Sequence, residues 1–265
     1  MTVTEAAPDA PAVAPSTGEE EPRGRSNLLH YVGVPLLLVA VLVAVYLYVT
    51  TAQLDDIEAR LLDTGKLLTA TGRHLQLVAV STVIVVLLAV PLGIAATRPS
   101  LRRLVPLIVG LGNIAQGVPS LGVVVLFAVV FATIGFKPAI FALVLYAFLP
   151  ILRNTIVGLE RVDPFVIESA RGMGLSRFAV LRRIELPLAV PVVLAGIRTA
   201  AVINVGTATI AALINAGGLG EIIYQGLVLN RQKAIIIGSV LAAVLALLLD
   251  YLGGLAEQFL RLKGL

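Results

Sequence analysis

The sequence contains no cysteine, no tryptophan and only two histidines. Without cysteine the chain can form no disulfide, thiolate metal site or cysteine nucleophile. His30 and His74 each stand just before an apolar run, a position more typical of an interfacial polar group than of a metal ligand. No His-Glu-x-x-His motif, Gly-x-Ser-x-Gly motif or cluster of carboxylates is present, so we expect neither a metal site nor a membrane-embedded hydrolase.

Charge is also scarce, and this defines the class of protein. Charged residues make up 14% of the chain and hydrophobic residues 58%, and the mean hydropathy is +0.98. A soluble domain carries about 25% charged residues, so the sequence predicts an all-α integral membrane protein embedded in the lipid bilayer. The net charge of +4 comes from Lys and Arg beside apolar segments. Cytoplasmic loops accumulate such residues, so nucleic-acid binding is not expected.

Six apolar segments predict the membrane spans. A bilayer core about 30 Å thick needs about 20 helical residues. The segments are 32–49, 75–96, 104–136, 138–152 (which must continue toward residue 157), 188–213 and 234–249. Segment 104–136 is too long for one straight helix and too short for two crossings. Asn113, Gln116, Pro119 and Ser120 in its middle predict a single broken crossing, because proline removes a backbone donor and irregular backbone needs protein or water beside it.

The distribution of Lys and Arg supports six spans with both termini in the cytoplasm. This arrangement places 13 of these residues inside and 6 outside, with Arg198 within a span. Two crossings in segment 104–136 would put the loop richest in arginine outside, against the positive-inside rule. Residues 1–26 are rich in Ala, Pro and Glu and lack periodicity, so we expect a disordered cytoplasmic tail.

A glycine-punctuated segment lies in the predicted cytoplasmic loop. Residues 168–174 read Glu-Ser-Ala-Arg-Gly-Met-Gly and are followed, after nine residues, by Ile-Glu-Leu-Pro at 184–187. Asp163 suits a helix N-cap and Pro164 the first helical position, and the glycines can stop that helix. Ser176 can cap a second short helix, which we expect Pro187 to end. Two short helices would form a compact knob.

This pattern resembles the E-A-A-x-x-x-G-x(9)-I-x-L-P loop of permease subunits in ABC importers, with Ser169 in place of the usual second Ala. The resemblance implies a coupling helix that docks onto a separate ATPase. Small residues at 170, 172 and 174 would permit close approach, and Glu168 would accept hydrogen bonds from partner cations. The residues implied in coupling are Asp163, Glu168, Ala170, Gly172, Gly174, Leu186 and Pro187.

The chain lacks a Gly-x-x-x-x-Gly-Lys-Ser/Thr phosphate loop, so we expect it to bind no nucleotide and no cofactor. It would be a transport subunit without enzymatic activity, and ATP and Mg would be bound by the partner ATPase.

Further runs resemble the permeases of osmoprotectant importers for glycine betaine, choline, carnitine or proline. They lie at residues 116–121, 137–140, 145–155, 196–198 and 216–220. The resemblance implies a type I importer core of five helices over 74–257, with an added N-terminal helix and external loop at 27–73 and a cytoplasmic tail at 258–265. It also implies a prokaryotic cell membrane, a substrate-binding protein, and a second permease copy or a sister permease. The Gly-Gly-Leu-Gly run also occurs in amino-acid importers, which leaves those as an alternative.

Polar residues within the spans are candidates for the translocation pathway. Arg198 can snorkel toward the cytoplasmic interface, or pair across a subunit interface or line a gate. Asn204 and the neighbouring threonines suit interhelical hydrogen bonds or substrate contacts. A quaternary ammonium group prefers aromatic faces, and the absence of Trp indicates that selectivity lies in a separate binding protein. The candidates are Asn113, Gln116, Pro119, Ser120, Asn154, Arg198, Asn204 and Thr207.

Two other classes of protein compete with this interpretation. A self-sufficient secondary transporter needs an intramembrane acid for ion coupling, and Asp250 is the nearest candidate. A membrane scaffold would not need the docking loop.

Overall fold

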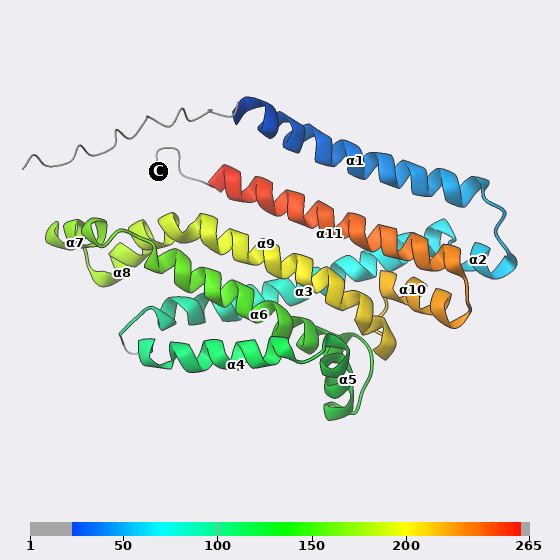
Figure 1. Ribbon diagram of the computed structural model, residues 1–265. Helices are drawn as coiled ribbons and strands as arrows, with labels where there is room; N and C mark the ends of the chain where they lie inside the picture. Colours follow the sequence, from blue (N-terminus) through cyan, green and yellow to red (C-terminus); the bar gives the residue numbers. More distant parts are fainter. Residues whose placement is uncertain (1–22, 100, 261–265) are drawn as a thin grey trace, which may run out of the picture.

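The computed structural model describes residues 23–99 and 101–260, with side chains from residue 32 onward (Figure 1). All regular structure in these residues is helical. The longer helices are α1 (Arg23–Thr51), α3 (Thr64–Ala96), α4 (Val105–Gly117), α5 (Ser120–Val130), α6 (Phe136–Glu160), α9 (Leu186–Ile210) and α11 (Gln232–Leu260). The shorter ones are α2 (Asp56–Leu61), α7 (Pro164–Gly172), α8 (Arg177–Val180) and α10 (Leu219–Val228), with single turns η1 (Arg102–Leu104), η2 (Leu181–Glu185) and η3 (Ala211–Ile214).

The all-helical fold is confirmed, with five or six candidate spans. Five stretches of helix are long and apolar enough to cross a membrane, and α4 and α5, bent by 99° at a short break, make a sixth if the pair is one span. The bend falls at Val118 and Pro119, as the cluster of helix-breaking residues predicted. Helix α6 extends past Leu152 to Glu160, which supplies the length that the short apolar segment lacked.

The helices at both ends of the chain extend into the segments that the sequence predicted as tails. Residues 1–22 and 261–265, which make up most of those two segments, lie outside the described residues. Helix α1 begins at Arg23, inside the segment expected to be tail, and α11 continues to Leu260.

Helix α6 lies between α3 and α9, and α9 also packs against α11, which in turn contacts α1 (Figure 1). Small residues allow the closest of these approaches. A Cβ atom built on Gly93 of α3 would lie 2.7 Å from Thr155 of α6, and one on Gly196 of α9 would lie 2.6 Å from the Cβ of Asn154. The backbones therefore meet at distances that larger side chains would prevent.

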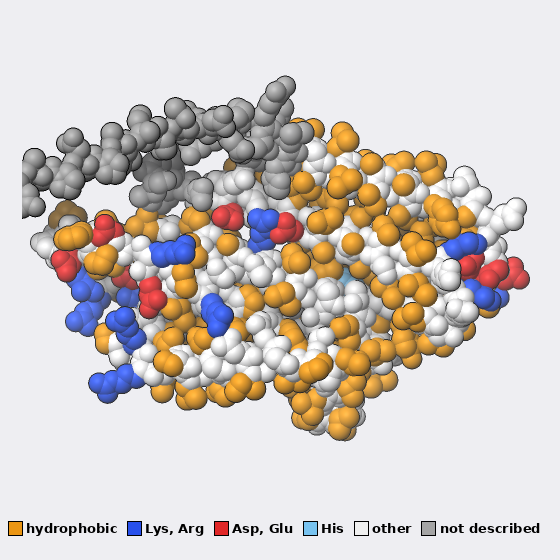
Figure 2. Space-filling model, in the orientation of Figure 1, with side chains coloured by type: hydrophobic (Ala, Val, Ile, Leu, Met, Phe, Trp, Pro, Cys, Tyr) orange, Lys and Arg blue, Asp and Glu red, His pale blue; other side chains and the backbone are white. Residues whose placement is uncertain are grey.

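The two ends of the bundle carry most of the charge. Helices α7 and α8 lie at one end, where α1 begins and α11 ends, and α2 and α10 lie at the other (Figure 1). Figure 2 shows many Lys, Arg, Asp and Glu side chains at the two ends, and a surface between them that is mostly apolar or uncharged apart from a few charged side chains near the middle of the face. This distribution suits helices that cross a hydrocarbon layer, where charge is expensive.

The sequence interpretation missed α2, which forms because its N-terminus is capped. The side chain of Asp55 accepts hydrogen bonds from the backbone N–H groups of Glu58 (2.7 Å) and Ile57 (3.0 Å), and the Glu58 side chain accepts one from the N–H of Asp55 (3.3 Å). This reciprocal capping box satisfies donors that a short helix would otherwise leave unpaired.

Candidate coupling loop and translocation pathway

The loop from residue 161 to residue 185, here called the α7–α8 loop, folds from its own capping signals. Asp163 accepts a hydrogen bond from the N–H of Phe165 at 2.8 Å, and Pro164 occupies the first position of α7. Gly174 adopts φ +86° after α7, a conformation that glycine reaches without steric cost. Ser176 then caps α8 by accepting from the N–H of Ala179 at 3.2 Å. The predicted pair of short helices is therefore present.

The expectation that Pro187 ends the second helix is wrong. Helix α8 passes through η2, a π-helical turn, directly into α9. The N–H of Leu186 bonds to the carbonyl of Leu181, five residues earlier, so the wider turn shifts the hydrogen-bond register just before the proline. Pro187 lies in the first turn of α9, where its missing N–H is tolerated. The loop is thus joined rigidly to a membrane helix.

Ala170 is 1% exposed, so it packs inside the chain and does not itself offer the small surface that the sequence predicted. Its carbonyl accepts a hydrogen bond from the N–H of Leu175, which closes the turn after α7. Gly172 and Gly174 have open space around their Cα atoms, and Glu168 is exposed, so these three residues remain available to a partner.

Glu185 anchors the loop to α3 and was not singled out by the sequence interpretation. Glu185 is 5% exposed, and both oxygens of its carboxylate contact the guanidinium group of Arg98, which lies just beyond the end of α3. Bidentate Arg–carboxylate pairs fix orientation as well as distance. The α7–α8 loop is therefore connected to α3 through this pair and to α9 through the continuous helix.

Large apolar side chains are exposed on the same loop. Phe165, Met173 and Phe178 are 77%, 75% and 71% exposed, although α7 and α8 lie at one end of the molecule and carry charged residues (Figure 1). Exposed apolar groups in such a position mark interaction surfaces. The sequence could not single out these three residues, because the loop also contains apolar residues that the fold buries or half-buries, such as Val162 and Val180.

At the broken span, the predicted pathway residues hold the bend in place. Gln116 donates to the carbonyl of Tyr146 on α6 at 2.9 Å, and the hydroxyl of Tyr146 donates back to the carbonyl of Val118 at the break. Arg153 of α6 donates to Asn113 of α4 at 2.8 Å. These contacts tie α4 and the break to α6, while Ser120 begins α5 with Pro119 at its N-cap.

The candidates Asn154, Asn204 and Thr207 form hydrogen bonds inside the chain, but of these only Asn204 bonds to another helix. Asn204 is fully buried and donates to Ser81 (2.9 Å) and Thr82 (3.1 Å) of α3, which bears out the interhelical interpretation. Thr207 bonds to the carbonyl of Ile203 in its own helix at 3.0 Å, and Asn154 bonds to a carbonyl of α6 at 2.8 Å. The Oδ1 atom of Asn204 has no hydrogen-bond partner among the described residues.

Arg198 has a partner that the sequence interpretation did not consider. It pairs within the chain with Asp250 of α11 through two contacts of 2.5 Å. Gly253 and Gly254 make room for the guanidinium group, because a Cβ on either would lie about 3 Å from the arginine side chain (2.9 and 3.1 Å). The carboxylate of Asp250 is therefore held by a permanent cation, which argues against its use in ion coupling.

At the opposite end, His74 organises the Gly-Gly-Leu-Gly run. The expectation of an interfacial histidine is wrong, because His74 is fully buried. Its Nδ1 accepts from the N–H of Leu219, the first residue of α10 (3.3 Å), and its Nε2 lies 3.1 Å from the carbonyl of Val205. The ring is therefore neutral, with its proton on Nε2. Gly217 and Gly218 adopt φ of +82° and +86°, which glycine tolerates.

Comparison with known proteins agrees with this class of membrane protein. Residues 89–261 match the model of the binding-protein-dependent transport system inner membrane component family. The chain belongs to this family, whose members are multi-pass permeases of ABC transport systems.

Individual relatives cover most of the chain. It is 40% identical over 201 residues to the glycine betaine/carnitine/choline transport system permease protein OpuCB of Bacillus subtilis, covering 76% of this chain and 91% of that protein. It is 40% identical over 214 residues to the osmoprotectant import permease protein OsmY of Salmonella typhimurium, covering 81% and 89%. Among solved structures, a chain of the MetNI methionine ABC transporter in an inward-facing conformation matches with a TM-score of 0.67 and 24% identity, over 74% of this chain and 96% of that chain. This last likeness establishes the fold alone.

Proposed function

We propose that this chain is the permease subunit of an ATP-driven importer for a quaternary ammonium osmoprotectant such as glycine betaine, choline or carnitine, or for proline. The observation that carries the proposal is the 40% identity to osmoprotectant permeases over about nine-tenths of their length (91% and 89%). The exposed apolar surface of the α7–α8 loop supports a subunit that works with another protein. A substrate-binding protein would deliver the solute and supply its selectivity.

The proposed partner at the α7–α8 loop is an ABC ATPase, which would bind ATP and Mg. Phe165, Met173 and Phe178 would enter its docking cleft, with Glu168 and the two open glycines of the loop beside them. Asp163 would hold α7 in place, while Leu186 and Pro187 would carry the movement into α9. This chain itself would catalyse no reaction.

The proposed translocation pathway runs beside the bend between α4 and α5. Asn113, Gln116, Pro119 and Ser120 would line it, because irregular backbone at membrane depth is tolerated against a cavity or protein. Asn154, Arg198, Asn204 and Thr207 would act by positioning the helices around it. A second permease subunit, either a copy of this chain or a sister permease, would complete the pathway.

The proposed orientation places both termini and the α7–α8 loop in the cytoplasm of a prokaryote, and α2 and α10 outside. The importer core would occupy residues 74–257, preceded by an added helix and external loop at 27–73. The basic residues at the α7–α8 end support this orientation through the positive-inside rule.

The test is uptake of labelled glycine betaine and choline by the reconstituted complex, with and without its binding protein. We expect ATP-dependent uptake only with the binding protein present. Unlabelled methionine and histidine are added as competitors, to test the alternative that the importer takes up amino acids. Robust uptake without the binding protein, or competition by these amino acids alone, would contradict the proposed substrate class.

A further inference from the structure

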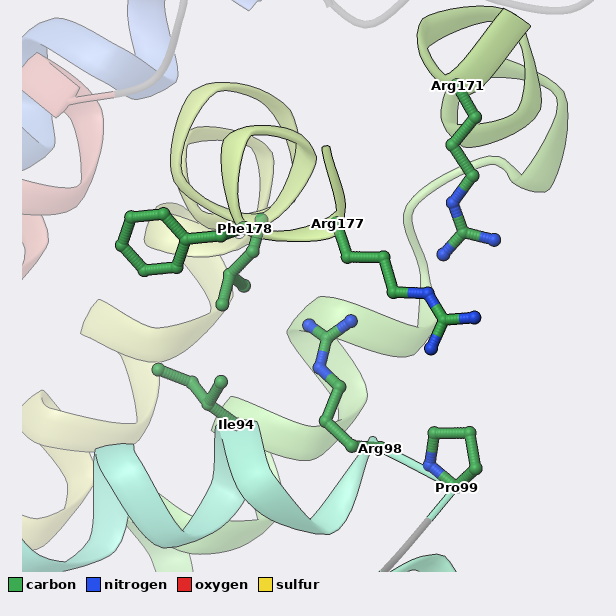
Figure 3. Close-up of a pocket in the computed structure, with 7 residues that line it drawn as sticks. Ile94, Arg98, Pro99, Arg171, Arg177 and Phe178 are labelled. Atoms are coloured by element: carbon green, nitrogen blue, oxygen red, sulfur yellow. The ribbon is translucent and has the colours of Figure 1, made fainter. Parts of the chain in front are cut away.

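A cavity of about 560 Å³ lies between the end of α3 and the α7–α8 loop. Three arginines from separate elements line it: Arg98 follows α3, Arg171 lies on α7, and Arg177 begins α8. In Figure 3 their guanidinium groups point toward the same space. The pathway and docking roles proposed above use none of these three groups as ligand contacts.

The charge in this cavity is only partly compensated. Arg98 pairs with the buried carboxylate of Glu185. Among the ion pairs formed by the described residues, none involves Arg171 or Arg177, and both are exposed. Guanidinium groups bind phosphate oxygens through paired hydrogen bonds. The arrangement therefore favours an anion, and a phosphate group in particular.

The other wall of the cavity is apolar and points to a lipid. Ile94 belongs to the last turns of the span α3 and Leu181 is half-buried, whereas the ring of Phe178 points away from the three arginines (Figure 3) and stays available to the ATPase. The arginines thus lie where the apolar surface of α3 ends, which is the level of the headgroups if α3 spans the bilayer. A free phosphate ion would leave this apolar wall uncovered, whereas the acyl chains of a phospholipid would cover it.

We propose that this cavity binds the phosphate headgroup of an anionic phospholipid from the leaflet that faces the ATPase. The assignment of that leaflet rests on the proposed function, but the lipid site itself does not. The bound phosphate would join Arg171 and Arg177 of the moving loop to Arg98 at the end of α3. Anionic lipid would therefore strengthen the connection between the loop and the membrane helices.

The test measures lipid retention by the full-length chain in detergent, using native mass spectrometry with added phosphatidylglycerol or phosphatidylcholine. The pocket variant is Arg171→Gln with Arg177→Gln. The matched control is Arg182→Gln with Arg183→Gln, which removes two exposed arginines of the same loop that do not line the cavity. Circular dichroism checks that both variants are folded.

We expect the unaltered chain and the control to retain phosphatidylglycerol in preference to phosphatidylcholine, and the pocket variant to bind it about tenfold more weakly, since charged hydrogen bonds are lost. Equal retention by the pocket variant and the control would overturn the proposal. Displacement of the lipid by inorganic phosphate at the same concentration would show that a free anion is the ligand. A pocket variant that keeps its lipid but loses the ATPase would show that the arginines contact that partner instead. Uptake is not part of this readout, so failure of the proposed substrate class would leave the result interpretable.

Discussion

The polar side chains at the two ends of the molecule differ in whether they have partners within the chain. At the α2–α10 end, the polar groups pair within the chain: Arg231 binds Asp55 at 3.0 Å, Lys233 binds Glu58 at 2.8 Å, and His74 bridges two backbone groups. At the α7–α8 end, Arg171, Arg177, Arg182 and Arg183 are exposed and form no ion pair among the described residues, beside exposed large apolar side chains. Helix α10 also exposes apolar side chains such as Leu227 and Val228, so the two ends differ mainly in how their charged groups are paired. This difference identifies the end at which we propose that the ATPase docks.

The largest expected effect follows from breaking the anchor of the α7–α8 end. Glu185→Ala leaves Arg98 without its partner, and because that guanidinium is only partly exposed, stability should fall by about 3 kcal/mol. ATP-driven uptake should fall about tenfold, since the loop is no longer tied to α3.

Thermal unfolding of the detergent-purified chain and uptake by the reconstituted complex measure these two effects. The control is Glu160→Ala, which removes an exposed carboxylate at the end of α6. If both variants retain normal uptake, the anchor does not transmit movement.

A smaller effect is expected from breaking the internal bonds of the opposite end. His74→Ala removes the acceptor of the Leu219 N–H and the donor to the Val205 carbonyl, which should cost about 2 kcal/mol because both groups stay buried. The neighbouring substitution Leu75→Ala, on an exposed position of the same helix, should change stability much less. Copurification of the ATPase should be unaffected by either variant. An equal loss of stability in both would show that the histidine contacts are unimportant.

The smallest effect concerns Asp55, the exposed carboxylate that pairs with Arg231 at the α2–α10 end. The pKa of Asp55 lies below its ordinary value of 3.8. The main cause is the hydrogen bond that its carboxylate accepts from the backbone N–H of Glu58. The charge of Arg231, the N–H of Ile57 and the charge of Lys233 lower this pKa further. A depressed folded-state pKa contributes stability above the unfolded value, and that contribution is lost as the pH falls through the folded value.

The difference in stability between the unaltered chain and Asp55→Asn should therefore be constant from about pH 8 to about pH 5 and shrink only below pH 3.8. Unfolding of the two proteins across this pH range measures it. A difference that changes near neutral pH would mean that another group controls this end.

Local features of the fold could be predicted from the sequence because their causes are local. Apolar length predicted the spans, and Asp163 and Ser176 predicted where α7 and α8 begin. The proline at 119 predicted the bend of the broken span.

The pairs that hold the helices together could not be predicted, because their members are far apart in the chain. Arg98 and Glu185 are separated by 87 positions, His74 and Leu219 by 145, and Arg198 and Asp250 by 52. Pro187 was misinterpreted because a π-helical turn can carry a helix into a proline, and sequence spacing does not reveal that turn. Burial of Ala170 likewise depends on packing within the folded loop.

The claim that the α7–α8 end is the docking surface can be tested by thiol labelling, since the chain has no cysteine of its own. Met173→Cys places a single thiol on the exposed part of the loop, and Thr64→Cys places one at the exposed start of α3, at the other end. Each variant is labelled with a water-soluble maleimide, with and without the ATPase subunits bound. We predict that bound ATPase slows labelling at position 173 at least about tenfold and leaves position 64 unchanged. Equal labelling of position 173 in the free and assembled protein would contradict the account.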